Sequence, residues 1–133
     1  MKGDPYMRTS REIDILKALG DQTRLRILAL LSTGERCVCE LMAALELPQS
    51  TVSRHVSRLS TSELIDGEKR GKWSYYRLAS EDSWQYQELH RFVEKLAHRQ
   101  PYLDDQISAN RVSKQPSCNE TGTPEPATTE KEN

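Results

Sequence analysis

The sequence predicts a mainly α-helical protein with a small β-hairpin, arranged as a winged helix-turn-helix. Apolar residues recur at helical spacing through residues 11–61, which is typical of amphipathic helices. From residue 65 the pattern changes to alternation on both sides of Gly71, which predicts a hairpin. Helical spacing returns from residue 84. Four helices with a tight turn before the fourth, then a hairpin and a last helix, are the elements of a winged helix.

The first three helices are predicted from where their apolar runs begin and end. A helix over residues 11–19 ends at Gly20, and Asp21 has the side chain of an N-cap for the next helix. That second helix, within residues 22–31, is apolar over most of its circumference, so it should lie in the middle of the core. A third helix is expected to run to about Glu46, with apolar residues at i, i+3, i+4 and i+7: Val38, Leu41, Met42 and Leu45.

The fourth helix, the hairpin and the last helix follow from breaks in the pattern. Leu47 and Pro48 interrupt it, and a helix is expected over about residues 49–61. Its inward residues are Val52, Val56 and Leu59. A hairpin with its turn at residues 70–72 comes next, and Ser83 then opens a helix that is longer than the core of one small domain requires.

Length and charge restrict the class of protein. The chain has 133 residues, of which 35% are hydrophobic, and a formal net charge of -1. This length fits one domain plus a tail, and this charge argues against a generally basic nucleic-acid binder. Basic residues are instead concentrated in residues 48–79, with six Lys and Arg against three acids. We expect a flexible N-terminus over residues 1–8, a domain over 9–104 and an extension over 105–133 that is largely a disordered acidic tail from about residue 113.

The fourth helix carries side chains suited to contacting DNA. Small polar residues at its start can approach base edges, Gln can pair bidentately with adenine, and Arg can read guanine or hold phosphate. Gly71 permits a tight turn from which two neighbouring cations would project outward. The candidate DNA contacts are Gln49, Ser50, Thr51, Ser53, Arg54, His55, Arg58, Arg70 and Lys72. His55 could instead satisfy a core group, and the aromatic residues Trp73 and Tyr76 fit packing better than base stacking.

The cysteine count bears on the cellular compartment. Three cysteines, an odd number, fit a reducing compartment better than a disulfide scaffold. No apolar stretch approaches the length of a membrane span, and the first ten residues lack the apolar core of a signal peptide. We therefore expect a cytoplasmic protein whose thiols act as ligands, redox groups or packing residues.

The most specific feature is the segment Arg36-Cys37-Val38-Cys39-Glu40. Cys37 stands at the N-cap of a capping box that Glu40 completes. Inside a regular helix, side chains two positions apart point about 200° apart, but a non-helical N-cap would let Cys37 turn toward Cys39. We expect the helix N-terminus to lower the pKa of both thiols and favour thiolates, which soft ions prefer. The alternative is a pair of small buried hydrophobes.

With these residues, the chain resembles the ArsR/SmtB family of winged-helix repressors, most closely its arsenic-responsive branch. The resemblance covers about residues 10–100. It is carried by residues 18–28, 35–41, 50–55, 71–73 and 76–78. It implies a homodimer formed through the first and last helices, which binds double-stranded operator DNA and leaves it when trivalent arsenic or antimony binds. No cofactor is implied for folding.

The resemblance makes Cys37 and Cys39 the inducer ligands. Members of this branch commonly carry a third cysteine where this chain has Met42, and a thioether is a weak replacement. Either two thiolates suffice with an outside ligand, or Cys118 in the tail supplies the third. The residue pattern of the zinc-sensing branch is missing. Three residues at i, i+4 and i+8 on the last helix fit a solvated face better than a zinc site: His90, Glu94 and His98.

The residues alone are also compatible with other functions. The same DNA-binding module could sense thiol oxidation or another soft metal. A thiol oxidoreductase is disfavoured because the spacing is Cys-x-Cys and no βαβ pattern accompanies it, so we expect no enzyme activity. A winged helix that contacts only protein would show no salt-sensitive affinity for DNA.

Overall fold

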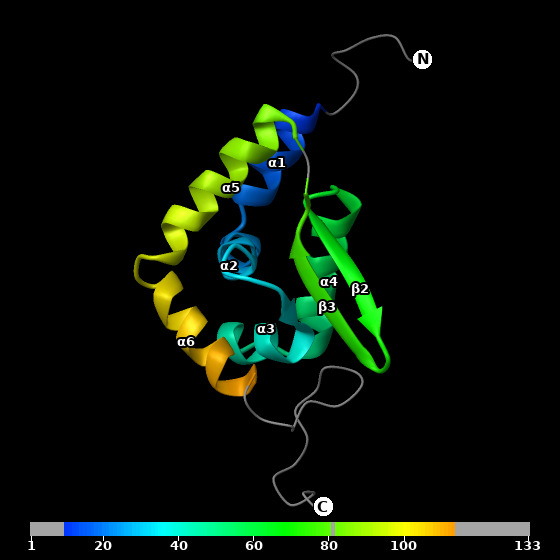
Figure 1. The fold of residues 1–133 in the computed structure, drawn as a ribbon, viewed down its shortest axis with the longest axis vertical. Coiled ribbons are helices and arrows are strands. Elements are labelled where there is room, and N and C mark those ends of the chain that lie inside the picture. Colours follow the sequence, from blue (N-terminus) through cyan, green and yellow to red (C-terminus); the bar gives the residue numbers. More distant parts are fainter. Residues whose placement is uncertain (1–9, 81, 114–133) are drawn as a thin grey trace, which may run out of the picture.

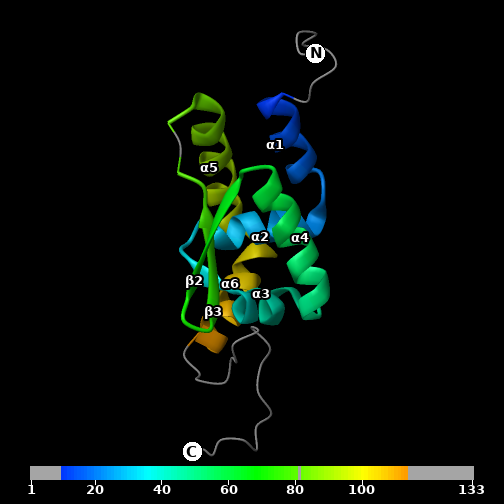
Figure 2. The ribbon, with the colours of Figure 1, turned by 90° about the vertical axis from the view of Figure 1, so that its right-hand side faces the viewer.

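The computed structural model describes residues 10–80 and 82–113. The helix α2 lies in the centre of the molecule, with α1 and α5 above it, α3 and α6 below it, and the β2–β3 hairpin beside it in the view of Figure 1 (Figures 1 and 2). The winged helix-turn-helix predicted from the sequence is confirmed. In order, its elements are α1 (Arg11–Leu19), α2 (Gln22–Leu31), β1 (Arg36–Cys37), α3 (Val38–Leu45), α4 (Gln49–Thr61), β2 (Ile65–Arg70), β3 (Trp73–Leu78), α5 (Trp84–Ala97) and α6 (Tyr102–Ser113).

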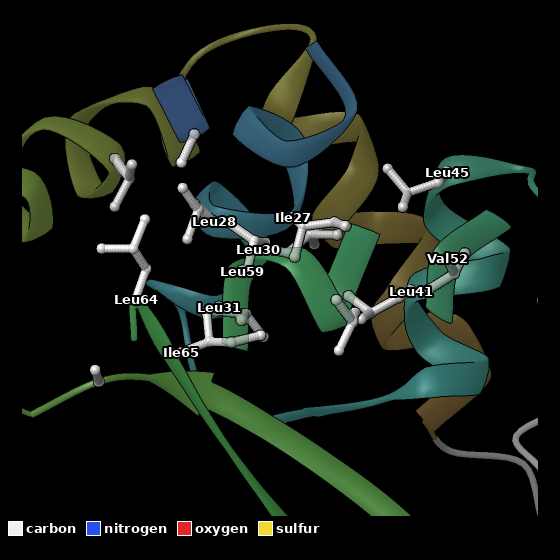
Figure 3. Packing of buried hydrophobic residues seen from close by; sticks show 14 of the residues in the cluster. Ile27, Leu28, Leu30, Leu31, Leu41, Leu45, Val52, Leu59, Leu64 and Ile65 are labelled. Carbon is white, nitrogen blue, oxygen red and sulfur yellow. The ribbon is translucent and has the colours of Figure 1, made fainter. Parts of the chain in front are cut away.

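The core surrounds α2, as its nearly uniform apolar circumference predicts. Ile27 and Leu28 are fully buried, and leucines and valines of α3 and α4 pack with them (Figure 3). Burying each such side chain contributes about 1.5–3 kcal/mol relative to leaving it exposed. The helix-turn-helix is therefore fixed to α2, and its outer face is left to polar residues. The residues predicted to point inward from α4 are all buried: Val52, Val56 and Leu59.

Asp21 is the N-cap of α2, as predicted. Its Oδ1 accepts a hydrogen bond from the Arg24 backbone N–H at 2.9 Å, which satisfies one of the unpaired donors of the first turn. This hydrogen bond, together with the positive charge of Arg24, lowers the pKa of the Asp21 carboxyl. The cap residue also lies beside His55, in the middle of α4.

We expect Asp21→Ala to lower the free energy of unfolding by about 0.5–2 kcal/mol at neutral pH. Because the folded-state pKa is depressed, this stabilisation is present above the pKa of the unfolded carboxyl and is lost as pH falls through the folded-state pKa. Urea unfolding at pH 7 and at acidic pH should show that the difference in free energy of unfolding between the variant and the wild type is smaller at acidic pH. Asp66→Ala, on the exposed part of β2, serves as control, and an equal loss in both variants would contradict the assignment of the cap.

Two elements were not predicted. The strand β1 adds a third strand to the expected hairpin, so the sheet order is β1-β3-β2 and both pairings are antiparallel. The helix α6 crosses the expected domain boundary at residues 104–105, so that boundary is wrong. The physical reason is that α6 packs along α3 and buries Ala109 and Asp105.

Candidate functional site

The two cysteines of the Cys-x-Cys segment meet at the start of α3. Cys37 is the N-cap, with extended backbone angles (φ -88°, ψ 167°), and Cys39 lies in the first turn. Their Sγ atoms are 3.0 Å apart, and both residues are buried. Two sulfurs bound to one ion at about 2.3 Å each can be no more than about 4.6 Å apart. The spacing therefore permits a shared ion, and the predicted turn of Cys37 toward Cys39 is confirmed.

Apolar side chains from distant parts of the chain form the wall around this thiol pair. Trp73 and Tyr75 of β3 and Val112 of α6 pack against the two cysteines. In the sheet, Cys37 lies directly opposite Tyr75. Met42, at the position where the third cysteine was expected, packs against the main core instead. The cluster formed by these two cysteines, Trp73, Tyr75 and Val112 is called the thiol pocket below.

Charged groups hold the polypeptide around the thiol pocket. The Glu40 carboxylate accepts a hydrogen bond from the Cys37 backbone N–H at 2.8 Å, which is the returning half of a capping box. The buried Arg36 donates to Asn110 Oδ1 of α6 at 2.7 Å and to Thr33 Oγ1 at 3.0 Å. The pocket is thus tied to the C-terminal helix on its polar side as well.

The expected depression of both thiol pKa values is wrong for Cys37. Burial raises the pKa of the Cys37 thiol, and the negative charge of Glu40 acts in the same direction. Backbone N–H groups of Glu40 and Cys39 oppose this shift and do not overcome it. The helix N-terminus is present, but desolvation of the thiolate outweighs it.

The candidate DNA contacts of α4 lie mostly on its solvent side. Arg54 and Arg58 are exposed and border one open hollow together with Ser57, and Ser50 is exposed near the helix start. Among the other candidates, Gln49, Thr51 and Ser53 are half-buried. His55 differs from the expectation: its side chain is only 16% exposed, and its Nδ1 lies 4.0 Å from Asp21 Oδ1. It therefore faces the cap of α2.

The wing, formed by β2, β3 and their turn, is less basic than its sequence implies. Arg70 does not project outward but binds the carboxylates of Glu35 and Glu68, which raise its pKa, and its guanidinium lies over the Tyr75 ring at 4.7 Å. Arg77 pairs with the same two acids. Lys72 is exposed at the turn, as expected.

Other candidate ligands do not gather into a second site. The His90 ring nitrogen lies 3.0 Å from the Ala79 carbonyl oxygen. Within residues 10–80 and 82–113 no three His, Cys, Asp or Glu side chains are grouped so that they could hold a metal. Cys118 lies outside the described residues. The helices of the described part are too short or too polar to cross a membrane.

Two features of the described structure involve residues that the sequence analysis did not single out. An open apolar groove runs between α1 and α5, and it includes exposed large side chains: Leu16, Trp84 and Phe92, with Ile13 nearby on α1. The unusual length of the α5 pattern was the signal for it. The second feature is a bidentate ion pair between Arg26 of α2 and Asp105 of α6, for which the sequence offers no local signal.

Comparisons with known proteins agree with this geometry. Residues 21–66 match the model of the bacterial regulatory protein arsR family. The chain is 44% identical over 78 residues to the arsenic resistance transcriptional regulator ArsR2 of Pseudomonas putida, covering 57% of this chain and 68% of that protein. It is 48% identical over 68 residues to the arsenical resistance operon repressor of Escherichia coli, covering 50% of this chain and 58% of that protein.

A solved structure extends the likeness to the whole winged helix. The homodimeric winged helix-turn-helix DNA-binding domain Mb0332 of Mycobacterium bovis, described as a possible ArsR-family transcriptional regulator, is 26% identical. Its TM-score is 0.56, and the match covers 75% of this chain and 97% of that one. Fold and family thus define a DNA-binding transcriptional regulator. The chain belongs to the ArsR family, and its named relatives include arsenical resistance repressors.

Proposed function

We propose that this protein is a homodimeric repressor of an arsenic or antimony resistance operon, released from double-stranded operator DNA when the trivalent ion binds Cys37 and Cys39. The observation that carries the proposal is the 3.0 Å separation of the two buried sulfurs at the start of α3. The names of the relatives support the inducer class.

In the proposed complex, two copies of α4 enter successive major grooves, whose centres are about 34–36 Å apart. Arg54 and Arg58 supply the main contacts, and the small polar residues near the start of α4 approach the base edges. Lys72 at the tip of the wing reaches the flanking backbone. Arg70 holds the wing to Glu35, and its guanidinium lies over the Tyr75 ring within the wing.

The dimer forms through the groove between α1 and α5. Leu16 and Trp84 expose 62% and 63% of their surface there, although large apolar side chains on a monomer surface are costly to leave in contiguous patches. A second copy related by a two-fold axis would present the same patch, and isologous contact buries both. The homodimeric Mycobacterium bovis relative supports this assembly.

The chemistry of trivalent arsenic fits a thiol whose pKa is raised, as that of Cys37 is. An As–OH group condenses with a thiol to give As–S and water, and the thiol proton leaves with the hydroxide. The raised pKa of Cys37 therefore does not oppose arsenic binding, whereas a divalent soft cation has to displace the thiol protons into solution. Two such condensations at Cys37 and Cys39 occupy two of the three valences.

We assign the third valence of inorganic arsenic to Cys118. Val112 of α6 contacts the thiol pair, and Cys118 follows it by only six residues. Six residues span up to about 20 Å when extended. The attachment of the C-terminal segment beside the pocket therefore supports Cys118 in place of the missing cysteine at position 42.

Two routes connect the thiol pocket to DNA. On the first, α3 packs directly against α4, so a shift at the start of α3 changes the spacing of the two reading helices in the dimer. In the second route, Cys37 pairs with Tyr75 in the sheet, and the Arg70 guanidinium lies over the Tyr75 ring, so a shift of Cys37 reaches the wing. A coupling free energy of about 1–3 kcal/mol would lower the affinity for DNA about 5–150-fold.

The test is fluorescence anisotropy of the reduced protein with its own upstream DNA, titrated with arsenite. We expect release from the wild type and none from Cys37→Ser, because a serine hydroxyl binds soft ions poorly. Affinity for DNA without arsenite should be unchanged in the variant. If Cys37→Ser is released as readily as the wild type, the proposed thiol gate is wrong.

The short distance between the sulfurs also favours a second candidate, a repressor that senses thiol oxidation. Release by an oxidant in the absence of arsenite, reversed by a reductant, would identify that function. Release only by arsenite would reject it.

A further inference from the structure

A small polar hollow lies where the end of α1 meets the first turn of α2 and the last turns of α4 (Figure 2). Its volume is about 150 Å³, which is enough for several water molecules. Three cations, one acid and one serine are among the residues that line it: Lys17, Arg24, Arg58, Asp14 and Ser62. The hollow therefore has an excess of positive charge and of hydrogen-bond donors, which is what an anion requires.

The three cations differ in how firmly the fold holds them. The Arg24 side chain is 14% exposed, its Nη2 donates to the Lys17 backbone carbonyl oxygen at 2.9 Å, and its Nη1 lies 3.7 Å from Asp21 Oδ2. The side chains of Lys17 and Arg58 are exposed, and the described part of the chain supplies no ion-pair partner to either. Arg24 thus provides a fixed charge, and the other two cations are available to a ligand.

A second hollow continues the first one along α4. The residues that line it are two arginines and three hydroxyl residues: Arg54, Ser57, Arg58, Thr61 and Ser62. Arg58 and Ser62 border both hollows. Arginine, lysine, serine and threonine are common donors to the phosphate oxygens of DNA. The two hollows therefore form a basic track that leads from the exposed side of the reading helix to α1.

We infer that the hollow at Lys17, Arg24 and Arg58 binds a backbone phosphate of the operator DNA, which makes α1 a DNA-contacting element. The inference rests on the proposed function, because it requires the complex with DNA. A phosphate of the DNA backbone carries one negative charge, and its free oxygens only accept hydrogen bonds, so they match the cations and the Ser62 hydroxyl. Such a contact positions the protein on DNA and reads no base sequence.

The place of the hollow on α1 puts this phosphate between the two half-sites. Asp14 and Lys17 line the hollow, whereas other residues of the same helix, Leu16 and Leu19 among them, line the apolar groove. One helix thus borders both the proposed dimer interface and the hollow. Since the groove lies at the two-fold axis of the proposed dimer, the two hollows lie near that axis, between the major grooves that the two copies of α4 enter.

The test is fluorescence anisotropy with the upstream DNA at several concentrations of sodium chloride. Lys17→Gln, which keeps a good helix former at an exposed position, should lower the slope of log K against log salt by about 0.9 per protomer, or about 1.8 for the dimer. We expect it to weaken binding at least about tenfold at about 0.1 M salt, on specific and on scrambled DNA alike. Asp14→Asn removes the opposite charge from the same hollow and should strengthen binding to both DNAs. Lys95→Ala, an exposed cation on α5, is the control.

A neutral methylphosphonate in place of single phosphates identifies the group that is bound. Scanned through the DNA between the half-sites, it should weaken binding of the wild type at the contacted phosphate. At that position it should weaken binding of Lys17→Gln far less, because the cation that the phosphate would pair with is already gone.

An unchanged salt slope in Lys17→Gln, with DNA binding intact, would overturn the inference and leave the proposed repressor standing. The inference also falls if sedimentation shows that the loss follows dissociation of the dimer. It falls as well if calorimetry finds Lys17-dependent binding of inorganic phosphate while the salt slope for DNA is the same in both proteins, since the hollow would then take a free anion. If the wild type has no salt-sensitive affinity for DNA, the proposed function itself fails.

Discussion

Replacing Arg54 and Arg58 together with Ala is expected to reduce the affinity for operator DNA at least about a thousandfold. Both guanidinium groups are on the exposed side of α4, and a dimer carries four of them. Contacts of this kind are worth about 1–3 kcal/mol each at a base edge, and even the lower figure gives about three orders of magnitude for four. Because Val52, Val56 and Leu59 hold the helix, the fold should not change.

The salt dependence of binding separates the roles of the two arginines. A phosphate contact that is lost lowers the slope of log K against log salt by about 0.9, whereas a lost guanine contact relaxes sequence preference instead. Each single variant is titrated by fluorescence anisotropy at several salt concentrations, on specific and on scrambled DNA. The result shows whether the replaced arginine contacts phosphate or guanine. Lys95→Ala, an exposed cation on α5, is the control. Equal losses in Lys95→Ala and the double variant would mean that α4 does not form the interface.

The helices of the winged helix were predictable because each is delimited by local chemistry. The apolar period, the cap at Asp21 and the breaks at Gly20 and Pro48 act within a few residues. In contrast, the apolar residues of α6 form only a weak helical period, and the helix docks through partners far away in sequence: Asp105 is 79 residues from Arg26, and Asn110 is 74 residues from Arg36. Such pairs leave no periodic signal, so the extension was expected to begin inside this helix.

The parts of the site that depend on residue spacing were predictable from the sequence. The parts that depend on burial were not. The N-cap position of Cys37 allowed its turn toward Cys39 to be foreseen from the sequence. The direction of the Cys37 pKa shift was not foreseen, because it depends on desolvation and on where the Glu40 carboxylate lies. In the same way Arg70, a free cation by its position in a turn, is bound by Glu35, which is 35 residues away. Residues that are distant in sequence determine the electrostatic environment of these side chains, and the sequence alone does not show which residues they contact.

Removing one partner of the ion pair between Arg26 and Asp105 is expected to destabilise the fold strongly. Arg26 Nε and Nη2 donate to the two Asp105 carboxylate oxygens at 2.9 and 2.8 Å, and Nη2 also donates to the Ala44 carbonyl oxygen at the end of α3 at 3.1 Å. The Asp105 side chain is 7% exposed and the Arg26 side chain 26%. Arg26→Leu therefore leaves a buried carboxylate without its partner, at a cost of about 3 kcal/mol.

Asp105→Leu should cost less, because Arg26 keeps the Ala44 carbonyl and can reach solvent. The double variant Arg26→Leu/Asp105→Leu should recover much of the stability, since a buried ion pair is often replaced by apolar residues with little loss. Urea unfolding of the four proteins at one protomer concentration measures the coupling. Losses that simply add would mean that the two charges do not stabilise each other.

The same series tests whether α6 holds the thiol pocket closed. Val112 packs on the cysteines, and α6 is fixed by Asp105 to α2 and by Asn110 to Arg36. Loosening the first attachment in Arg26→Leu should expose Cys37 and raise its rate of alkylation in the reduced protein under native conditions, with the double variant returning toward the wild-type rate. Because alkylation through local opening reports the population of the open form, unchanged alkylation in a destabilised Arg26→Leu would show that the pocket opens independently of this helix.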